Sequence, residues 1–254
     1  QEGFYTVTVR LPLGDITPEG LRALAAIAET YAAEVRSAIS QNLLLRFVPE
    51  EALGGLYEAL LEAGLALPEA HTLLDITRCP GADTCNLAIT RSRGLAQALE
   101  AHLSALPLAQ DPGAKAIGVK ISGCPNSCGQ HHIADIGFFG AERRAHGRSA
   151  PGYQMLLGGH VGDEKIEFGA KALRLPAKAA PQAVVRVVGR YATEREHGET
   201  FQAWLERVGG AKEVAEGLAD LDEFPTPEIG PEVYVDFGET GRDEKSLGES
   251  ECAV

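Results

Sequence analysis

Two kinds of hydrophobic pattern alternate at the start of the chain. Residues 4–11 alternate apolar and polar side chains, which predicts a strand with one buried face. Residues 15–34 repeat apolar side chains at helical spacing, with Thr17 placed to cap the helix and Pro18 in its first turn. The next predicted elements are a strand over 42–48 and a helix over 49–65 that Gly64 closes.

This β-α-β-α unit is too small to form a stable sheet by itself. Two strands expose unpaired edges, and an isolated strand pair is marginally stable in water. We therefore expect a partner sheet, supplied by another part of a longer chain or by a second subunit.

After Pro68 the pattern changes to that of an α/β domain. A helix is expected to begin near Cys85, and the residues from 211 read as an acidic tail, extended over the surface or partly disordered. Further strands are expected over 114–122, 133–140, 152–162 and 171–176, and further helices over 181–196 and 199–209. The predicted organisation is residues 1–67, 68–210 and 211–254.

Composition and charge narrow the class of protein. A chain of 254 residues that is 44% hydrophobic can bury a substantial core. The net charge of −13 argues against nucleic acid as a partner, because phosphate contacts need clustered Lys and Arg. No apolar run is long enough to span a membrane and no export signal is recognisable, so we expect a cytoplasmic protein.

Four of the five cysteines carry the candidate chemistry. Five residues separate Cys79 from Cys85, and three separate Cys124 from Cys128, whereas Cys252 near the end reads as an untied, exposed thiol. Four thiolates in two pairs suit either zinc or an iron–sulfur cluster. The five-residue gap is wide for a zinc knuckle, which favours the cluster and leaves structural zinc, and after it buried free thiols, as the alternatives.

The spacing of the two cysteine pairs strongly resembles a known signature. "CPGADTC" and "SGCPNSCGQHHIADIG", with 38 residues between the inner cysteines, resemble the siroheme and [4Fe-4S] motif of the nitrite and sulfite reductase family. "VRSAISQNLLLRF", "GYQMLLGG" and "ETFQAWLERVG" are also similar to family segments. The resemblance covers residues 4–210. It implies an α+β fold in which a ferredoxin-like half-domain precedes an α/β domain that binds siroheme and the cluster.

The resemblance also implies residue roles. Cys79, Cys85, Cys124 and Cys128 would ligate a [4Fe-4S] cluster, and Cys128 would bridge it to siroheme iron. Siroheme carries eight carboxylates and needs cationic and amide donors. The candidates are Arg36, Gln41 and Asn42 by motif, and Arg78, Thr84, Arg91, Lys120 and Asn126 by closeness to the cysteines, with Lys120 also a catalytic candidate beside Cys128. His131 and His132 are expected to have structural or solvent-facing roles.

The implied activity is the six-electron reduction of nitrite to ammonia, or of sulfite to sulfide, with a one-electron donor such as ferredoxin. Family members of the common type join two homologous halves, and this chain looks like the second, cluster-bearing half. A homologous N-terminal half or a second subunit would complete the sheet and the site for the small anion, since Ala38 and Ser40 replace substrate-facing residues. The alternatives are a compact sulfite reductase that pairs with itself and a non-catalytic electron-transfer subunit.

Overall fold

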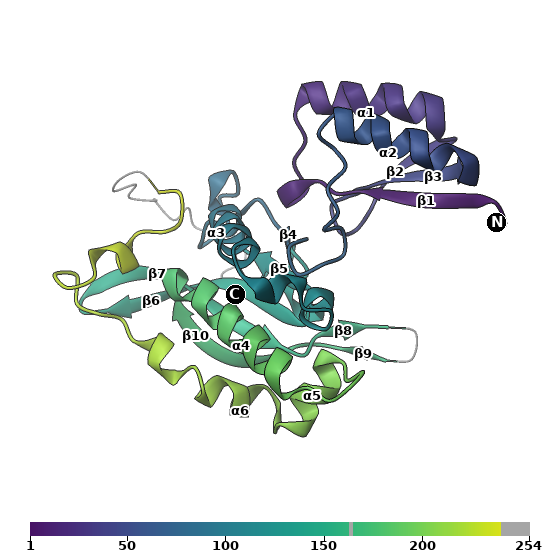
Figure 1. The fold of residues 1–254 in the computed structure, drawn as a ribbon. Helices are drawn as coiled ribbons and strands as arrows, with labels where there is room; N and C mark the ends of the chain where they lie inside the picture. The colour runs from purple at the N-terminus through teal and green to yellow at the C-terminus, as the bar shows by residue number, and fades with distance from the viewer. Residues whose placement is uncertain (163–164, 240–254) are drawn as a thin grey trace. The chain divides into compact units, whose positions relative to one another are not determined.

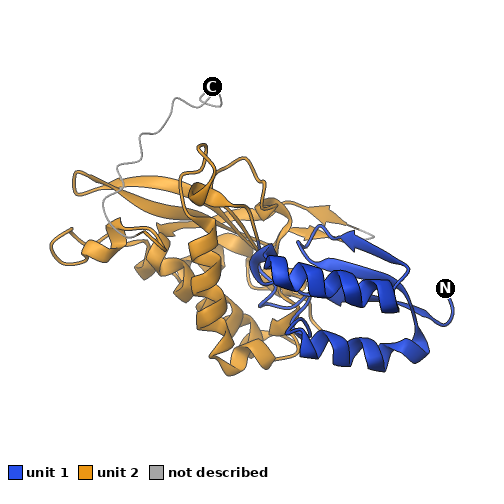
Figure 2. Cartoon of the chain, turned by 90° about the horizontal axis from the view of Figure 1, so that it is seen from above, with its two compact units in different colours: residues 1–77 blue, residues 78–254 orange. Residues whose placement is uncertain are grey.

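The structure, a computed structural model, describes residues 1–162 and 165–239. It divides into two units between Thr77 and Arg78 (Figure 2). The sequence predicted this boundary after residue 67. Among the described residues, no helix has both the length and the apolar character needed to cross a lipid bilayer.

The first unit is a three-stranded antiparallel sheet with two helices on one face (Figure 1). The sheet order is β1 (Phe4–Val9), β3 (Leu43–Pro49) and β2 (Glu34–Ser37). Helices α1 (Pro18–Tyr31) and α2 (Leu53–Glu62) pack their apolar faces against it. The unit therefore has its own hydrophobic core, formed by Val9, Leu11, Leu24, Ile27, Ala28, Leu45, Val48, Leu56 and Leu60.

Two predicted helix ends in this unit, the cap at Thr17 and the stop at Gly64, are confirmed. The Thr17 hydroxyl accepts the Gly20 N–H at 3.0 Å, an N-cap contact that stabilises a helix by about 1 kcal/mol. At the end of α2, Gly64 has a φ of +69°, and the Leu65 N–H reaches back to the Leu60 carbonyl at 2.8 Å. This left-handed turn favours glycine because it has no Cβ.

One strand of the first unit was missed. The expected order was β-α-β-α, and the structure inserts β2 between α1 and β3. Its four residues are mostly exposed and lack an alternating apolar pattern, so the sequence gives no local signal for it. It forms by pairing with β3, where Arg36 lies opposite Leu44.

The second unit is built on a five-stranded mixed sheet in the order β10-β7-β6-β5-β4. Strands β5 and β6 run parallel, whereas β6–β7 and β7–β10 are antiparallel. The strands span Thr77–Arg78 (β4), Val119–Ser122 (β5), Ile136–Ala145 (β6), Arg148–Leu157 (β7) and Ala170–Pro176 (β10), and a separate small pair joins His160–Val161 (β8) to Ile166–Glu167 (β9). The carboxyl end of β5 leads directly into the second cysteine pair.

The helices of this unit correct two sequence predictions. Helix α3 begins at Ser92 rather than near Cys85, and the first part of the expected tail is helical, with a helix that ends at Glu216 and a 3-10 helix over Ala219–Asp222. The last residues of the predicted tail, 240–254 with Cys252, lie outside the described residues. The α-helices span Ser92–Ser104 (α3), Ala180–Glu194 (α4), Phe201–Arg207 (α5) and Gly210–Glu216 (α6). In the first unit, short 3-10 helices span Pro12–Gly14 and Glu50–Ala52. In the second unit they span Gly81–Asp83, Pro107–Gln110, Ala114–Ala116, His131–Ile133, Ala177–Ala179, Ala219–Asp222 and Pro231–Tyr234.

Candidate metal centre

The first cysteine loop runs from the end of β4 to the turns before α3. Cys79 directly follows β4 and is buried, whereas Cys85 is half-buried after a 3-10 turn over 81–83. Gly81 opens this turn with a φ of +63°, and a Cβ there would lie 2.6 Å from the Ser92 backbone nitrogen. Both the backbone conformation and the close approach to α3 therefore require glycine at this position.

The second cysteine loop follows β5. Cys124 is buried and Cys128 is exposed, and Ser127 has a φ of +61° in the turn between them. The carbonyl of Gly123 accepts the N–H groups of Ile89 and Thr90 at 2.8 and 3.1 Å. These bonds attach the second loop to the segment that follows the first loop, so the two cysteine pairs meet in one unit.

A backbone donor and a serine hydroxyl lie beside the sulfur of Cys79. The Gly123 N–H donates to Cys79 Sγ at 3.1 Å, and the Ser92 hydroxyl lies 3.4 Å from the same sulfur. The Ser92 hydroxyl also donates to the Cys79 carbonyl at 2.7 Å. Donors of this kind orient a thiolate ligand and stabilise its charge.

The other three thiols act electrostatically on Cys124. Burial raises the pKa of the Cys124 thiol above its ordinary value, and the charges of the other three cysteines raise it further. The Asn126 N–H acts in the opposite direction, as a hydrogen-bond donor to Cys124. All four thiols are free of disulfide bonds. A cluster that delocalises the negative charge of four adjacent thiolates is the chemistry that this arrangement suits.

The four sulfurs do not converge on one point. Over residues 1–162 and 165–239, no three His, Cys, Asp or Glu side chains lie close enough together to hold a single metal ion. A [4Fe-4S] cluster places each cysteine on a different iron, so its ligands need not converge. The donor set of four thiols, with N–H groups aimed at sulfur, therefore fits a cluster.

Comparison with known families decides the assignment. Residues 1–63 match the nitrite/sulfite reductase ferredoxin-like half domain, and residues 69–218 match the nitrite and sulphite reductase 4Fe-4S domain. The second match alone covers more than half of the chain. The chain belongs to the nitrite and sulfite reductase family. The family and fold class predicted from the sequence are thus confirmed, including a [4Fe-4S] domain.

Relatives in this family include enzymes named for both substrates. The ferredoxin–nitrite reductase of Synechococcus elongatus is 35% identical over 178 residues, which is 68% of this chain and 33% of that enzyme. A ferredoxin sulfite reductase of Mycobacterium tuberculosis is 31% identical over 216 residues, which is 82% of this chain and 38% of that enzyme. The chain therefore spans between a third and two fifths of the length of these relatives.

Two solved structures share the fold. The Mycobacterium tuberculosis NirA protein matches with a TM-score of 0.72 and 30% identity, covering 85% of this chain and 40% of that one. A dissimilatory sulfite reductase I matches with a TM-score of 0.64 over 94% of this chain and 73% of that one. At 12% identity, the second likeness concerns the fold alone.

Three of the siroheme candidates lie in the first unit of this reductase-family chain. The Arg36 side chain is exposed and donates from Nε to Glu34 at 2.7 Å. Gln41 adopts a φ of +68° beside Gly14. Asn42 is buried, and its side-chain oxygen Oδ1 accepts the Leu11 N–H at 2.9 Å. Its amide nitrogen also donates to Asp75 at 2.7 Å and to Ser40 at 3.3 Å. Asn42 therefore holds its own loop in place, and a siroheme role for these three residues stays a prediction.

The other candidates lie in or beside the cysteine loops. Arg78 is buried in β4, and Thr84 and Asn126 are exposed within the loops. Arg91 joins the first loop to α3, because its Nη1 donates to Asp83 at 3.1 Å. Lys120 in β5 donates to the Gln130 side chain at 3.0 Å. Their cofactor and catalytic roles stay predictions, although the fold brings all five to the cysteine-bearing unit.

Sequence reasoning gave little weight to His131 and did not single out Ser92. His131 is fully buried, and its Nδ1 lies 2.8 Å from the Ser122 hydroxyl, which accepts the Gly129 N–H at 3.0 Å. Burial, with a smaller effect of His132, lowers the pKa of His131 to about 4. A neutral imidazole thus supports the second loop, whereas Ser92 carries no motif and is found only from its contact with Cys79.

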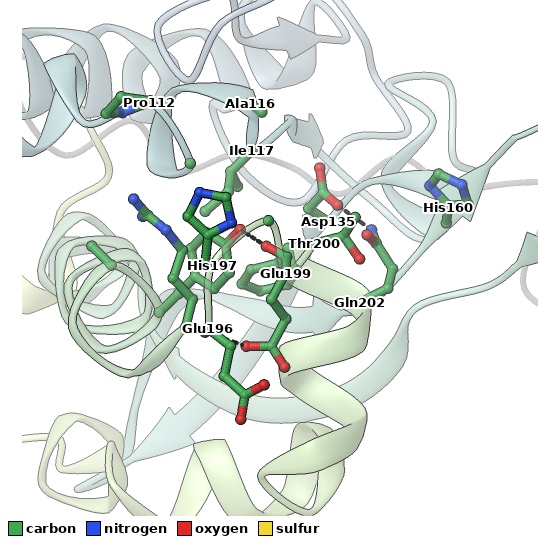
Figure 3. A pocket seen from close by; sticks show the side chains of 16 residues that line it. Pro112, Ala116, Ile117, Asp135, His160, Glu196, His197, Glu199, Thr200 and Gln202 are labelled. Carbon is green, nitrogen blue, oxygen red and sulfur yellow. Dashed lines mark hydrogen bonds between the residues drawn. The ribbon is translucent and has the colours of Figure 1, made fainter.

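A cavity of about 830 Å³ lies elsewhere in the second unit (Figure 3). The Asp135 and Gln202 side chains meet on one side of it, and Asp135 also accepts the Gly118 N–H at 2.7 Å. Burial raises the pKa of the Asp135 carboxyl. Ile117 lines the cavity just before β5, whereas Cys124 follows β5. The cavity and the cysteine loops therefore lie at opposite ends of the strand.

Proposed function

We propose that this chain is the cluster- and siroheme-bearing part of a reductase that converts nitrite to ammonia by a six-electron reduction. Cys79, Cys85, Cys124 and Cys128 would hold the [4Fe-4S] cluster, and Cys128 would also contact siroheme iron. The bound cofactors supply single-electron transfer to a small anion. The chain's own residues hold and orient them and set the polarity around the sulfurs.

One observation carries this proposal: two cysteine loops that are 38 residues apart in sequence come together in one unit, with backbone N–H groups directed at sulfur. Burial differs among the four thiols in a way that suits the assigned roles. Cys79 and Cys124 are buried, whereas Cys128 is exposed. An accessible fourth sulfur can contact a second cofactor, while the buried sulfurs are protected from solvent.

Sulfite is the second candidate substrate. Relatives named as nitrite reductases and as sulfite reductases match this chain at 35% and 31% identity. "GCPNSCGQHHIADIGFFG" is more similar to the nitrite-reducing branch, which places nitrite first. A purely electron-transferring subunit is less favoured, because both parts of the chain match domains of reductases.

The proposed partners are a ferredoxin-type electron donor and a second half-domain. Strands β1 and β2 form the two edges of the sheet in the first unit, and Phe4 and Val35 on these strands are 47% and 45% exposed. Open edges beside exposed apolar side chains favour pairing with another sheet. That partner would also supply the cations that grip the substrate, in place of Ala38 and Ser40.

The test is anaerobic reconstitution of the 254-residue chain with iron, sulfide and siroheme. We expect a Soret band, a red absorption band and close to four irons per chain in the cluster. With reduced methyl viologen as donor, nitrite should yield ammonium, and a homologous N-terminal half should increase the rate. A folded chain that takes up neither cofactor would exclude the proposal, and sulfide production without ammonium production would assign sulfite instead.

A further inference from the structure

The described chain ends in a segment, residues 235–239, that is attached to the start of α3. Asp236 is 3% exposed, and its Oδ2 accepts the Arg91 N–H at 2.7 Å. Its other carboxylate oxygen accepts the Phe237 N–H at 2.8 Å, and the Glu239 carboxylate accepts the Asp236 N–H at 2.9 Å. We call residues 235–239 the C-terminal segment.

Packing holds this segment from two sides. A Cβ on Gly94, in the first turn of α3, would lie 2.6 Å from Cβ of Phe237, so the segment lies against the helix backbone. On the other side, Lys178 Nζ is 4.1 Å from the centre of the Phe237 ring and 3.5 Å from the Asp236 carbonyl oxygen. The segment is therefore held on α3 by the fit of Phe237 against Gly94 and by the contacts of Lys178 with the Phe237 ring and the Asp236 carbonyl oxygen.

Asp236 supplies a helix cap that the local sequence lacks. Arg91 is the N-cap residue of α3, and its side chain makes no capping hydrogen bond. In a capping box, an acidic side chain within the same helix accepts the N–H of the N-cap residue. Here the acceptor comes from 145 residues away in the sequence. A carboxylate at this end also interacts favourably with the helix dipole.

The capped end of α3 is part of the cysteine site. Ser92, the first residue of α3, is fully buried and contacts both the carbonyl and the sulfur of Cys79. Arg91 links this helix end to the first cysteine loop and to the C-terminal segment. Its Nη1 donates to Asp83 in the loop and lies 3.5 Å from the Gly238 carbonyl oxygen in the segment. A displacement of this helix end would therefore move the Ser92 hydroxyl away from Cys79.

We propose that Asp236 is a positioning residue of the cluster site: by holding the N-terminus of α3, it fixes the Ser92 hydroxyl against Cys79. This inference rests on the proposed function, because it needs a cluster on Cys79. Partners that orient a metal ligand typically contribute 10- to 100-fold to metal affinity. Loss of the Asp236 carboxylate should therefore loosen the cluster and change the hydrogen bonding to one of its sulfurs.

The test compares Asp236→Ala, Asp236→Asn and Asp220→Ala with the unmodified chain after anaerobic reconstitution. Asp220 is a matched control, because its exposed carboxylate pairs with Arg186 and does not contact α3. The measurements are the rate of iron release to a chelator, and the midpoint potential and EPR spectrum of the cluster. We expect about tenfold faster release and a shifted potential for Asp236→Ala. Iron release from Asp236→Asn should be faster than from the unmodified chain and slower than from Asp236→Ala, because asparagine keeps an acceptor oxygen. Asp220→Ala should release iron at the same rate as the unmodified chain.

A further variant separates positioning from helix stability. Gly94→Ala should strengthen α3 itself by roughly 0.5–1 kcal/mol, yet its methyl group would displace Phe237. Faster iron release from Gly94→Ala would support the inference. This variant also provides the test if Asp236→Ala does not fold. Unchanged release and potential in both Asp236 variants would overturn the inference alone. Failure of the unmodified chain to bind a cluster would instead overturn the proposed function.

Discussion

Gly123 and Gly81 bring the two cysteine loops into backbone contact: a Cβ on Gly123 would lie 2.9 Å from the Cα of Gly81. The same methyl group would lie 2.8 Å from the Thr90 carbonyl oxygen. Real Cβ atoms do not approach backbone this closely, so any larger residue at 123 would separate the loops. The distance between the cysteine pairs thus depends on two glycines, one in each loop.

Gly123→Ala should therefore impair cluster binding. We expect a destabilisation of about 1–3 kcal/mol from overpacking and a clear loss of iron and acid-labile sulfide per chain after reconstitution. Gly189→Ala in α4 is the control, because no atom lies within 4 Å of its added Cβ and the change should stabilise the helix slightly. Full cluster content in Gly123→Ala would show that the loops can separate without cost.

Cys128→Ser should uncouple the two cofactors. Cys128 is exposed, unlike Cys79 and Cys124, and it is the proposed bridge to siroheme. We expect the Soret band to shift or disappear and the EPR signals of coupled centres to be lost. Cys252→Ser removes the cysteine that was assigned no ligand role and should leave the spectra unchanged. A coupled siroheme spectrum that persists in Cys128→Ser would refute the bridge.

Acid should destabilise the cofactor-free protein partly through His131. Burial holds the pKa of His131 at about 4, compared with 6.5 for an unhindered imidazole, so the native state favours the neutral form. The unfolded state binds the proton first as the pH falls below 6.5. Stability from this group is therefore complete above pH 6.5 and is lost progressively toward pH 4, by up to about 3 kcal/mol.

Urea unfolding at pH 7.5 and pH 5.0 measures this effect. His131→Phe should lower the stability at pH 7.5, because the hydrogen bond with Ser122 is lost, and it should reduce the further loss at pH 5.0. His102→Gln, which changes an exposed histidine on α3, is the control for the loss of an imidazole. An equal loss on acidification in the unmodified chain and His131→Phe would contradict the prediction.

Asn42→Ala should destabilise the first unit even without cofactors. The substitution leaves the Leu11 N–H without its buried acceptor and removes the donor to Asp75, which costs about 1–3 kcal/mol. Arg36→Ala is the comparison, because the exposed Arg36–Glu34 ion pair should contribute little to stability. Thermal unfolding of the cofactor-free chain measures both. If Arg36→Ala also weakens siroheme uptake, its predicted role is supported.

Local signals predicted much of the fold, and distant contacts account for the misses. The Thr17 hydroxyl caps the start of a helix and Gly64 adopts the left-handed turn at the end of another, and the structure confirms both. The start of α3 was placed near Cys85, whereas the helix begins at Ser92 after Arg91, an N-cap residue whose side chain makes no capping hydrogen bond. Its cap is Asp236, which sequence reasoning had assigned to a solvated tail. Long-range partners of this kind cannot be found from a local pattern.

The candidate site also has features that follow from local sequence and features that depend on distant contacts. The spacing of the four cysteines was enough to predict a cluster and a family. The roles of Ser92 and Gly123 depend on how two loops separated by 38 residues approach each other. Gly123 lies in the quoted cysteine signature, whereas Ser92 carries no motif. The sequence predicted a structural or solvent-facing role for His131. Its burial and its contact with Ser122 show that it supports the second loop.

The exposure of Cys128 has a consequence for how the protein acquires its iron. The two loops are joined by backbone hydrogen bonds from Cys79 to Ile121 and from Ile89 and Thr90 to Gly123, so the ligand set is complete only in the folded chain. Cys79 and Cys124 are by then buried, and a cluster carrier would first encounter the sulfur of Cys128. Maturation should therefore follow folding and proceed from the outermost thiol inward.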